Sequence, residues 1–220
     1  MTKISLNRPI LISFYGFPGS GKSYLARNLA SSMSVALISA DRLRAEIFKK
    51  PRFDQQENAI VAHLTSYMTE EFLRAGMGVA FDGDSQSAKQ RRYLRHLADR
   101  HNAKYILVWL QIDPDTAYAR TQRRDRRTID DKFAQPLSQA SFQQKLSIMQ
   151  NPESEDYLVI SGKHAFVTQK NTIVSFLYRE GLITSAHVQQ SAMAKPGLVN
   201  LVPHRPAEAE SQNLRNISIY

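Results

Sequence analysis

The chain has 220 residues, 42% of them hydrophobic, and a formal net charge of +9. This length accommodates one packed α/β domain with an appendage and excludes two full domains. The sequence contains no cysteine, which excludes disulfides, thiolate metal sites and cysteine nucleophiles. No apolar stretch reaches membrane-spanning length, so we predict a cytoplasmic protein with no membrane partner. The positive charge favours anionic partners: a nucleotide, a phosphorylated metabolite or nucleic acid.

A glycine-rich motif follows the first apolar run, Ile10–Tyr15, which we predict to be a buried strand. The motif has the spacing G-x-x-x-x-G-K-S, and a predicted helix over residues 23–30 follows it. In such a motif the backbone N–H groups turn toward phosphates, the lysine reaches the β- and γ-phosphates, and the serine hydroxyl binds Mg²⁺. The chain is therefore predicted to bind a nucleoside triphosphate, through Gly16, Phe17, Pro18, Gly19, Ser20, Gly21, Lys22, Ser23 and Tyr24.

An acidic and a basic residue follow the second predicted strand, Val35–Ser39. Asp41 and Arg44 are three residues apart at the start of a predicted helix, so their side chains face the same way. A doubly wound sheet presents its ligands at the carboxyl ends of its strands. Asp41 could therefore take a proton from an acceptor hydroxyl while Arg44 binds substrate. The alternative is a helix cap with a solvent-exposed arginine.

The third predicted strand, Val79–Phe81, ends in Asp82. This carboxylate could hold Mg²⁺ directly or through water, or could simply cap the end of the strand. Before this strand, the apolar residues between Ile60 and Leu73 predict one face of a long helix that ends at Gly76.

The remaining apolar runs complete an alternation of strands and helices. Strands are predicted over Tyr105–Ile112 and Tyr157–Ile160, and helices around Leu94, from Asp113 to about Arg126, and around Ile173. Continuous apolar strands separated by helices indicate a parallel sheet that is covered on both faces.

The composition changes after Leu182, where Ser, Gln, Ala, Pro and Asn become frequent. We predict one domain over residues 1–183 and a C-terminal extension over residues 184–220 that is either mobile or docked on the body.

With these motifs the chain resembles the P-loop kinases that include 5′-hydroxyl polynucleotide kinases, zeta-toxin-type kinases and chloramphenicol phosphotransferase. The resemblance extends from Ile10 to about Leu182. It implies a three-layer α/β fold with five parallel strands in the order 2-3-1-4-5. It also implies ATP and Mg²⁺ as cofactors, with Asp41 as general base toward the acceptor hydroxyl and Arg44 as a ligand of the acceptor.

The segment after the fourth strand looks like the arginine-bearing helical lid of these kinases. Arg120 and Arg124 are four residues apart, so on a helix they would share one face. The resemblance implies that these two arginines stabilise the transferring phosphoryl group, while Lys22 and Ser23 position the phosphate and Mg²⁺. A solvated helix face is the alternative for this arginine cluster.

Three functions stay open from the sequence. The first is a kinase acting on a nucleic-acid 5′ end, favoured by a basic segment between Lys89 and Lys132 that lacks aromatic residues placed for stacking. The second is a kinase of a small hydroxylated molecule. The third is a regulatory NTPase module that binds ATP and has no acceptor.

Overall fold

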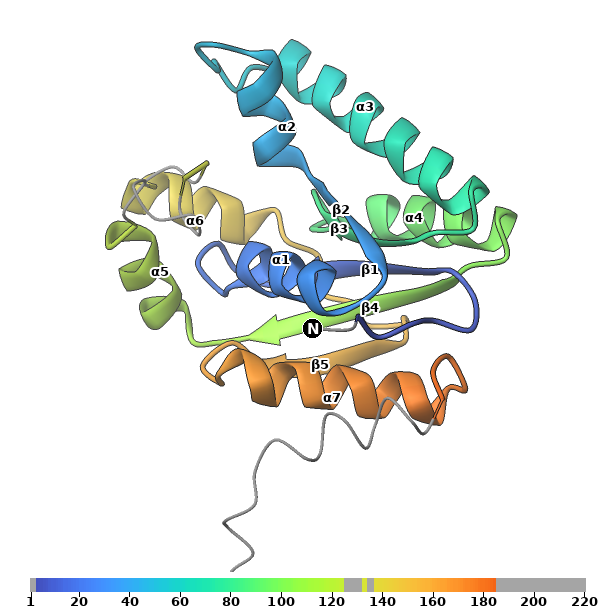
Figure 1. The fold of residues 1–220 in the computed structure, drawn as a ribbon. Coiled ribbons are helices and arrows are strands. Elements are labelled where there is room, and N and C mark those ends of the chain that lie inside the picture. The colour runs from blue at the N-terminus through green and yellow to red at the C-terminus, as the bar shows by residue number, and fades with distance from the viewer. Residues whose placement is uncertain (1–2, 125–131, 134–136, 185–220) are drawn as a thin grey trace, which may run out of the picture.

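A computed structural model gives the architecture of residues 3–124, 132–133 and 137–184 (Figure 1). Five parallel strands form one sheet in the order β2-β3-β1-β4-β5. The order and direction of the strands confirm the predicted sheet. The strands are β1 (Ile10–Tyr15), β2 (Val35–Ser39), β3 (Gly78–Asp82), β4 (Lys104–Gln111) and β5 (Tyr157–Ser161).

Helices cover both faces of the sheet (Figure 1). Leucines of α1 and aliphatic residues of α7 pack with β1 and β4 in one buried cluster. Residues of α3 and α4 pack with β1 and β3 in a second cluster. The helices are α1 (Lys22–Ser32), α2 (Ala40–Ile47), α3 (Gln55–Arg74), α4 (Ala88–Arg100), α5 (Pro114–Gln122), α6 (Gln139–Ser147) and α7 (Phe166–Arg179).

The segment after β4 departs from the prediction. The helix expected to reach about Arg126 ends at Gln122, so Arg124 lies beyond it and does not share a helical face with Arg120. Arginines four residues apart repel each other in a helix, and the Gln122 side chain instead donates to the carbonyl of Leu137. The chain then forms α6, which the sequence analysis did not predict. Residues 125–131, 134–136 and 185–220 lie outside the described residues, and with them nearly all of the predicted C-terminal extension.

The predicted apolar face of α3 is partly wrong. Ile60 is 39% exposed. The buried positions of this helix include Val61, Thr65, Thr69 and Leu73, which recur every fourth residue. The two threonine hydroxyls donate to helix carbonyls one turn back, so they can be buried without an unsatisfied donor.

Arg91 of α4 is buried completely, although it belongs to the basic segment between Lys89 and Lys132 that favoured a nucleic-acid substrate. Its guanidinium lies 2.7 Å from the carboxylate of Glu155, just before β5, and donates to the carbonyls of Ser85 and Gln86. It also stacks on the ring of Tyr15, 5.1 Å from the centroid. This arginine therefore ties the β3–α4 loop to the segment before β5.

Replacing Arg91 with Met is expected to lower the free energy of unfolding by about 3–5 kcal/mol, because it leaves the Glu155 carboxylate buried without its partner. Urea denaturation measures the loss. The matched control is Arg92→Met at the adjacent, exposed position. Equal stability of the two variants would contradict the structural role of Arg91.

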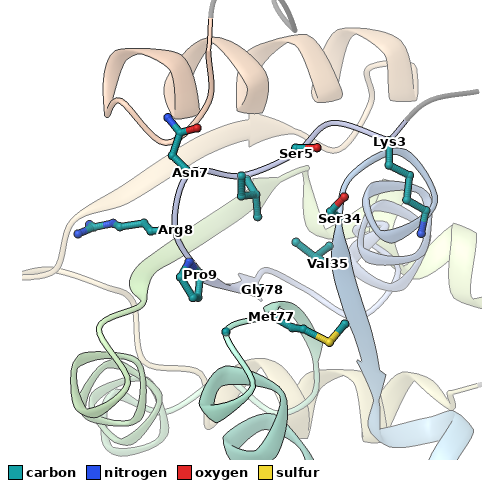
Figure 2. Close-up of a pocket in the computed structure, with 11 residues that line it drawn as sticks. Lys3, Ser5, Asn7, Arg8, Pro9, Ser34, Val35, Met77 and Gly78 are labelled. Carbon is teal, nitrogen blue, oxygen red and sulfur yellow. The ribbon is translucent and has the colours of Figure 1, made fainter.

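A cavity of about 540 Å³ lies at the amino-terminal edge of the sheet, between the segment before β1 and the starts of β2 and β3 (Figure 2). None of the predicted site residues lines it. Within the described part of the chain, no helix is both long and apolar enough to cross a membrane.

Candidate active site at the carboxyl edge of the sheet

The glycine-rich loop connects β1 to α1, as the motif requires. Gly19 has φ +84°, and a Cβ on it would lie 2.2 Å from the carbonyl oxygen of Ala117 in α5, so only glycine fits. Lys22 folds back over the loop and donates to the carbonyls of Gly16 and Phe17, both at 2.8 Å. The loop is thus clamped between α5 and its own lysine.

Two residues predicted to bind Mg²⁺ meet at this edge. The hydroxyl of Ser23, at the start of α1, donates to Oδ1 of Asp82 at 2.9 Å. Asp82 is the last residue of β3 and lies opposite Ser39, the last residue of β2, whose hydroxyl donates to Oδ2 at 3.1 Å. A hydroxyl and a carboxylate beside a phosphate-binding loop are the hard oxygen ligands that Mg²⁺ takes, and the remaining ligands are commonly waters. Ser23 and Asp82 therefore fit this ion.

Burial raises the pKa of Asp82, and the nearby charge of Asp41 raises it further. The hydrogen bonds from Ser23 and Ser39 and the charge of Lys22 oppose this shift without cancelling it. The fold therefore disfavours the charged form of Asp82 unless a bound cation compensates its charge.

The fold also disfavours the charged form of Lys22. Burial lowers its pKa to about 8, with the charges of Arg124 and Lys145 lowering it and those of Asp82 and Asp41 opposing them. The predicted residues Asp41, Asp82 and Arg124 therefore all act electrostatically on Lys22. Lys145 of α6 also acts electrostatically on Lys22.

Arg44 lies in a different environment from the predicted one. Its guanidinium is held by α3, with Nη1 3.3 Å from Glu57 and Nη2 2.6 Å from Oδ1 of Asn58. Arg44 is 7% exposed, whereas Asp41 is exposed. Asp41 therefore faces solvent at the start of α2 while Arg44 joins α2 to α3, and binding of substrate by Arg44 would require its release from Glu57 and Asn58.

Arg120 contacts the loop after β5. Its Nη1 donates to the carbonyl of Gly162, in the loop after β5, at 2.8 Å. A Cβ on Gly162 would lie 2.7 Å from the carbonyl of Ser20, so this loop packs directly on the glycine-rich loop. Arg120 thus holds the loop after β5 against the glycine-rich loop. Arg124 acts electrostatically on Lys22.

Sequence reasoning missed two residues of the site. Ser39 carried a usable signal, because it ends the strand next to the one that ends in Asp82 and neighbouring parallel strands end at the same edge. Lys145 carried none, since it comes from a helix that was not predicted. Packing of Phe142 and Leu146 of that helix with Phe17 of the glycine-rich loop brings α6 to the site.

Comparison with known proteins adds a family and a fold. Residues 11–149 match the family described as AAA domain. No curated protein matches the sequence. A solved structure of a putative kinase from Chloroflexus aurantiacus covers 79% of this chain and 98% of its own, with TM-score 0.61 and 17% identity.

Two further structures have the same fold. The APS kinase CysC of Mycobacterium tuberculosis, solved with AMPPNP and APS, has TM-score 0.55 and 18% identity, covering 78% of this chain and 98% of its own. Kti12 of Chaetomium thermophilum, solved with ADP-AlF3, has TM-score 0.57 and 16% identity, covering 80% of this chain and 100% of its own. At these identities the similarity shows the fold alone.

Proposed function

Because the chain belongs to the AAA domain family, we propose that it is an ATP-dependent phosphotransferase that moves the γ-phosphoryl group to a hydroxyl of a small molecule or of a nucleic-acid 5′ end. The observation that carries the proposal is the convergence of Lys22, Ser23, Asp41 and Asp82 at the carboxyl edge of the sheet. The APS kinase CysC, which has the same fold, forms a complex with AMPPNP, and this supports the choice of an adenine nucleotide.

Each residue has a distinct role in the proposed reaction. The loop N–H groups and Lys22 bind the phosphates of ATP. Asp41, exposed beside them, accepts the proton of the acceptor hydroxyl as its oxygen bonds to the γ-phosphorus and the bond to the β-phosphate oxygen breaks, releasing ADP. Arg124 and Lys145 supply positive charge where the phosphoryl group moves. Arg120 holds the loop after β5 in place.

Ser23 and Asp82 would hold Mg²⁺ in this scheme. When bound, the ion neutralises charge on the phosphate oxygens.

Transfer from γ-labelled ATP tests the proposal. The full chain is incubated with Mg²⁺ and 5′-hydroxyl oligonucleotides of DNA and RNA, and in parallel with a panel of small polyols, sugars and nucleosides. Label on a product with the wild-type protein, and none with Lys22→Met, is expected. ATP binding measured by calorimetry with no labelled product on any acceptor would instead favour the regulatory NTPase module.

The affinity for ATP is expected to fall as pH rises above about 8. In the free protein Lys22 has a pKa of about 8. Bound phosphates favour its charged form, so binding above this pH takes up a proton and weakens by at most tenfold per pH unit. Calorimetric titrations at several pH values, in two buffers of different ionisation enthalpy, measure affinity and proton uptake. An affinity for ATP that stays constant from neutral to alkaline pH would contradict this prediction.

A further inference from the structure

Helices α2 and α3 rise from the sheet as an arm, and the connection between them forms its outer end (Figure 1). We call residues 47–53 the arm tip; their sequence is Ile-Phe-Lys-Lys-Pro-Arg-Phe. Two apolar side chains of this segment face solvent, Ile47 at 42% exposure and Phe53 at 38%. Neither is needed to fill the core.

The arm tip is also basic. Lys49 and Lys50 are exposed, and neither makes an ion pair with another described residue. Arg52 does, with Asp54 at 3.1 Å and with Glu57. The two lysines therefore leave two uncompensated charges beside an exposed aromatic ring.

The backbone holds that ring in a strained conformation. Phe53 has φ +60°, which is uncommon for a bulky side chain. Glu57 fixes it, because this buried carboxylate accepts the backbone N–H groups of Arg52 and Phe53, both at 2.9 Å. These hydrogen bonds lower the pKa of Glu57 although burial raises it. A buried carboxylate thus maintains the strain that places the ring at the surface.

The ring of Phe53 lies on a cation. The guanidinium of Arg44 sits 4.7 Å from its centroid, and Glu57 and Asn58 hold that guanidinium. The ring is therefore a fixed platform, because a charged and hydrogen-bonded group supports it from the protein side.

We propose that the arm tip binds single-stranded nucleic acid, with a base stacked on Phe53 and backbone phosphates on Lys49 and Lys50. An exposed, rigid aromatic ring next to uncompensated lysines is the combination that such strands recognise, since stacking takes any base and the lysines follow the backbone. A membrane surface is less well matched, because the apolar side chains stand beside a rigid strained loop and not along one face of an amphipathic helix. The proposal does not depend on phosphoryl transfer and applies without ATP.

Fluorescence anisotropy of short, 3′-labelled single strands of DNA and RNA, without nucleotide, tests it. The full-length protein is expected to bind, and Phe53→Leu to weaken binding about tenfold or more. The double variant Lys49→Gln/Lys50→Gln is expected to lower the slope of log affinity against log salt by about 1.4. Circular dichroism and thermal melts verify that each variant is folded.

The matched controls lie on α7, across the sheet from the arm. Tyr178→Leu removes an aromatic side chain that is 47% exposed. The double variant Lys170→Gln/Arg179→Gln removes two positive charges, as many as the Lys49/Lys50 variant removes. Both controls are expected to bind like the wild type. Equal losses in tip and control variants would show attraction by net charge alone and overturn the proposal. So would absence of binding, or binding by the arm tip to phosphatidylserine vesicles but not to oligonucleotides.

Discussion

Replacing Asp41 with Asn is expected to lower phosphoryl transfer by about 10³-fold while leaving ATP affinity within about twofold. Asp41 is exposed at the start of α2 and interacts electrostatically with both Lys22 and Asp82. The amide keeps the size of the side chain but cannot accept the proton of the acceptor hydroxyl at neutral pH. Single-turnover transfer to the labelled acceptor, beside calorimetric titration of ATP, measures the two effects separately.

The control for this substitution is Glu46→Gln, which removes an exposed carboxylate from the same helix one to two turns further on. It is expected to transfer at the wild-type rate. If Asp41→Asn instead weakened ATP binding as much as transfer, the aspartate would be a nucleotide or metal ligand, and its assignment as general base would be wrong.

Replacing Asp82 with Asn is expected to lower transfer by about 10²-fold or more and to stabilise the nucleotide-free protein. The stability effect follows from the raised pKa of Asp82, which burial causes. For an acid with a raised pKa, the stabilisation is complete below the unfolded pKa of 3.8 and is lost as pH rises through the folded pKa. At neutral pH the wild-type carboxylate therefore destabilises the fold, and the amide removes that effect.

Two measurements test this second prediction together: transfer as a function of Mg²⁺ concentration, and urea denaturation without nucleotide at neutral pH and near pH 4. The difference in free energy of unfolding between Asp82→Asn and the wild type should be smaller near pH 4 than at neutral pH. Ser39→Ala serves as the control, because it keeps the carboxylate and removes one of its hydrogen bonds. A less stable Asp82→Asn protein at neutral pH would mean that the carboxylate is structural.

Asp82→Asn is expected to lower phosphoryl transfer and to raise the free energy of unfolding, and these opposite effects distinguish a functional residue from a structural one. Arg91 is expected to matter to stability, because its buried guanidinium pairs with Glu155. Burial raises the pKa of Asp82 and lowers that of Lys22, so the fold disfavours the charged form of both side chains. This pattern is expected at functional sites, where activity is kept at a cost in stability.

Much of the fold was readable from local sequence. Each strand is a short apolar run, and the glycine-rich motif is placed by the strand before it and the helix after it. The hydrogen bond between Ser23 and Asp82 could be expected in outline. Parallel strands end at one edge of the sheet, where both the glycine-rich loop after β1 and the end of β3 lie.

Other features depended on contacts between distant residues. Arg44 was predicted to bind substrate and Arg91 was counted in the basic segment between Lys89 and Lys132. Each instead pairs with a buried carboxylate that no local sequence pattern predicts, Glu57 for Arg44 and Glu155 for Arg91. The helix after β4 ended at Gln122, whose side chain donates to the carbonyl of Leu137 fifteen residues further on, and α6 formed from a sequence with little apolar periodicity.

The sequence alone determined the order of the strands along the chain, the parallel sheet and the glycine-rich loop, because strand length, apolar pattern and glycine spacing are local properties of the chain. Tertiary structure decided which charges face solvent and which are paired, since a carboxylate thirteen or sixty-four residues away can hold a guanidinium only once helices pack. It therefore also decided that Asp41 is exposed, that Arg44 is held by α3, and that Lys145 acts electrostatically on Lys22.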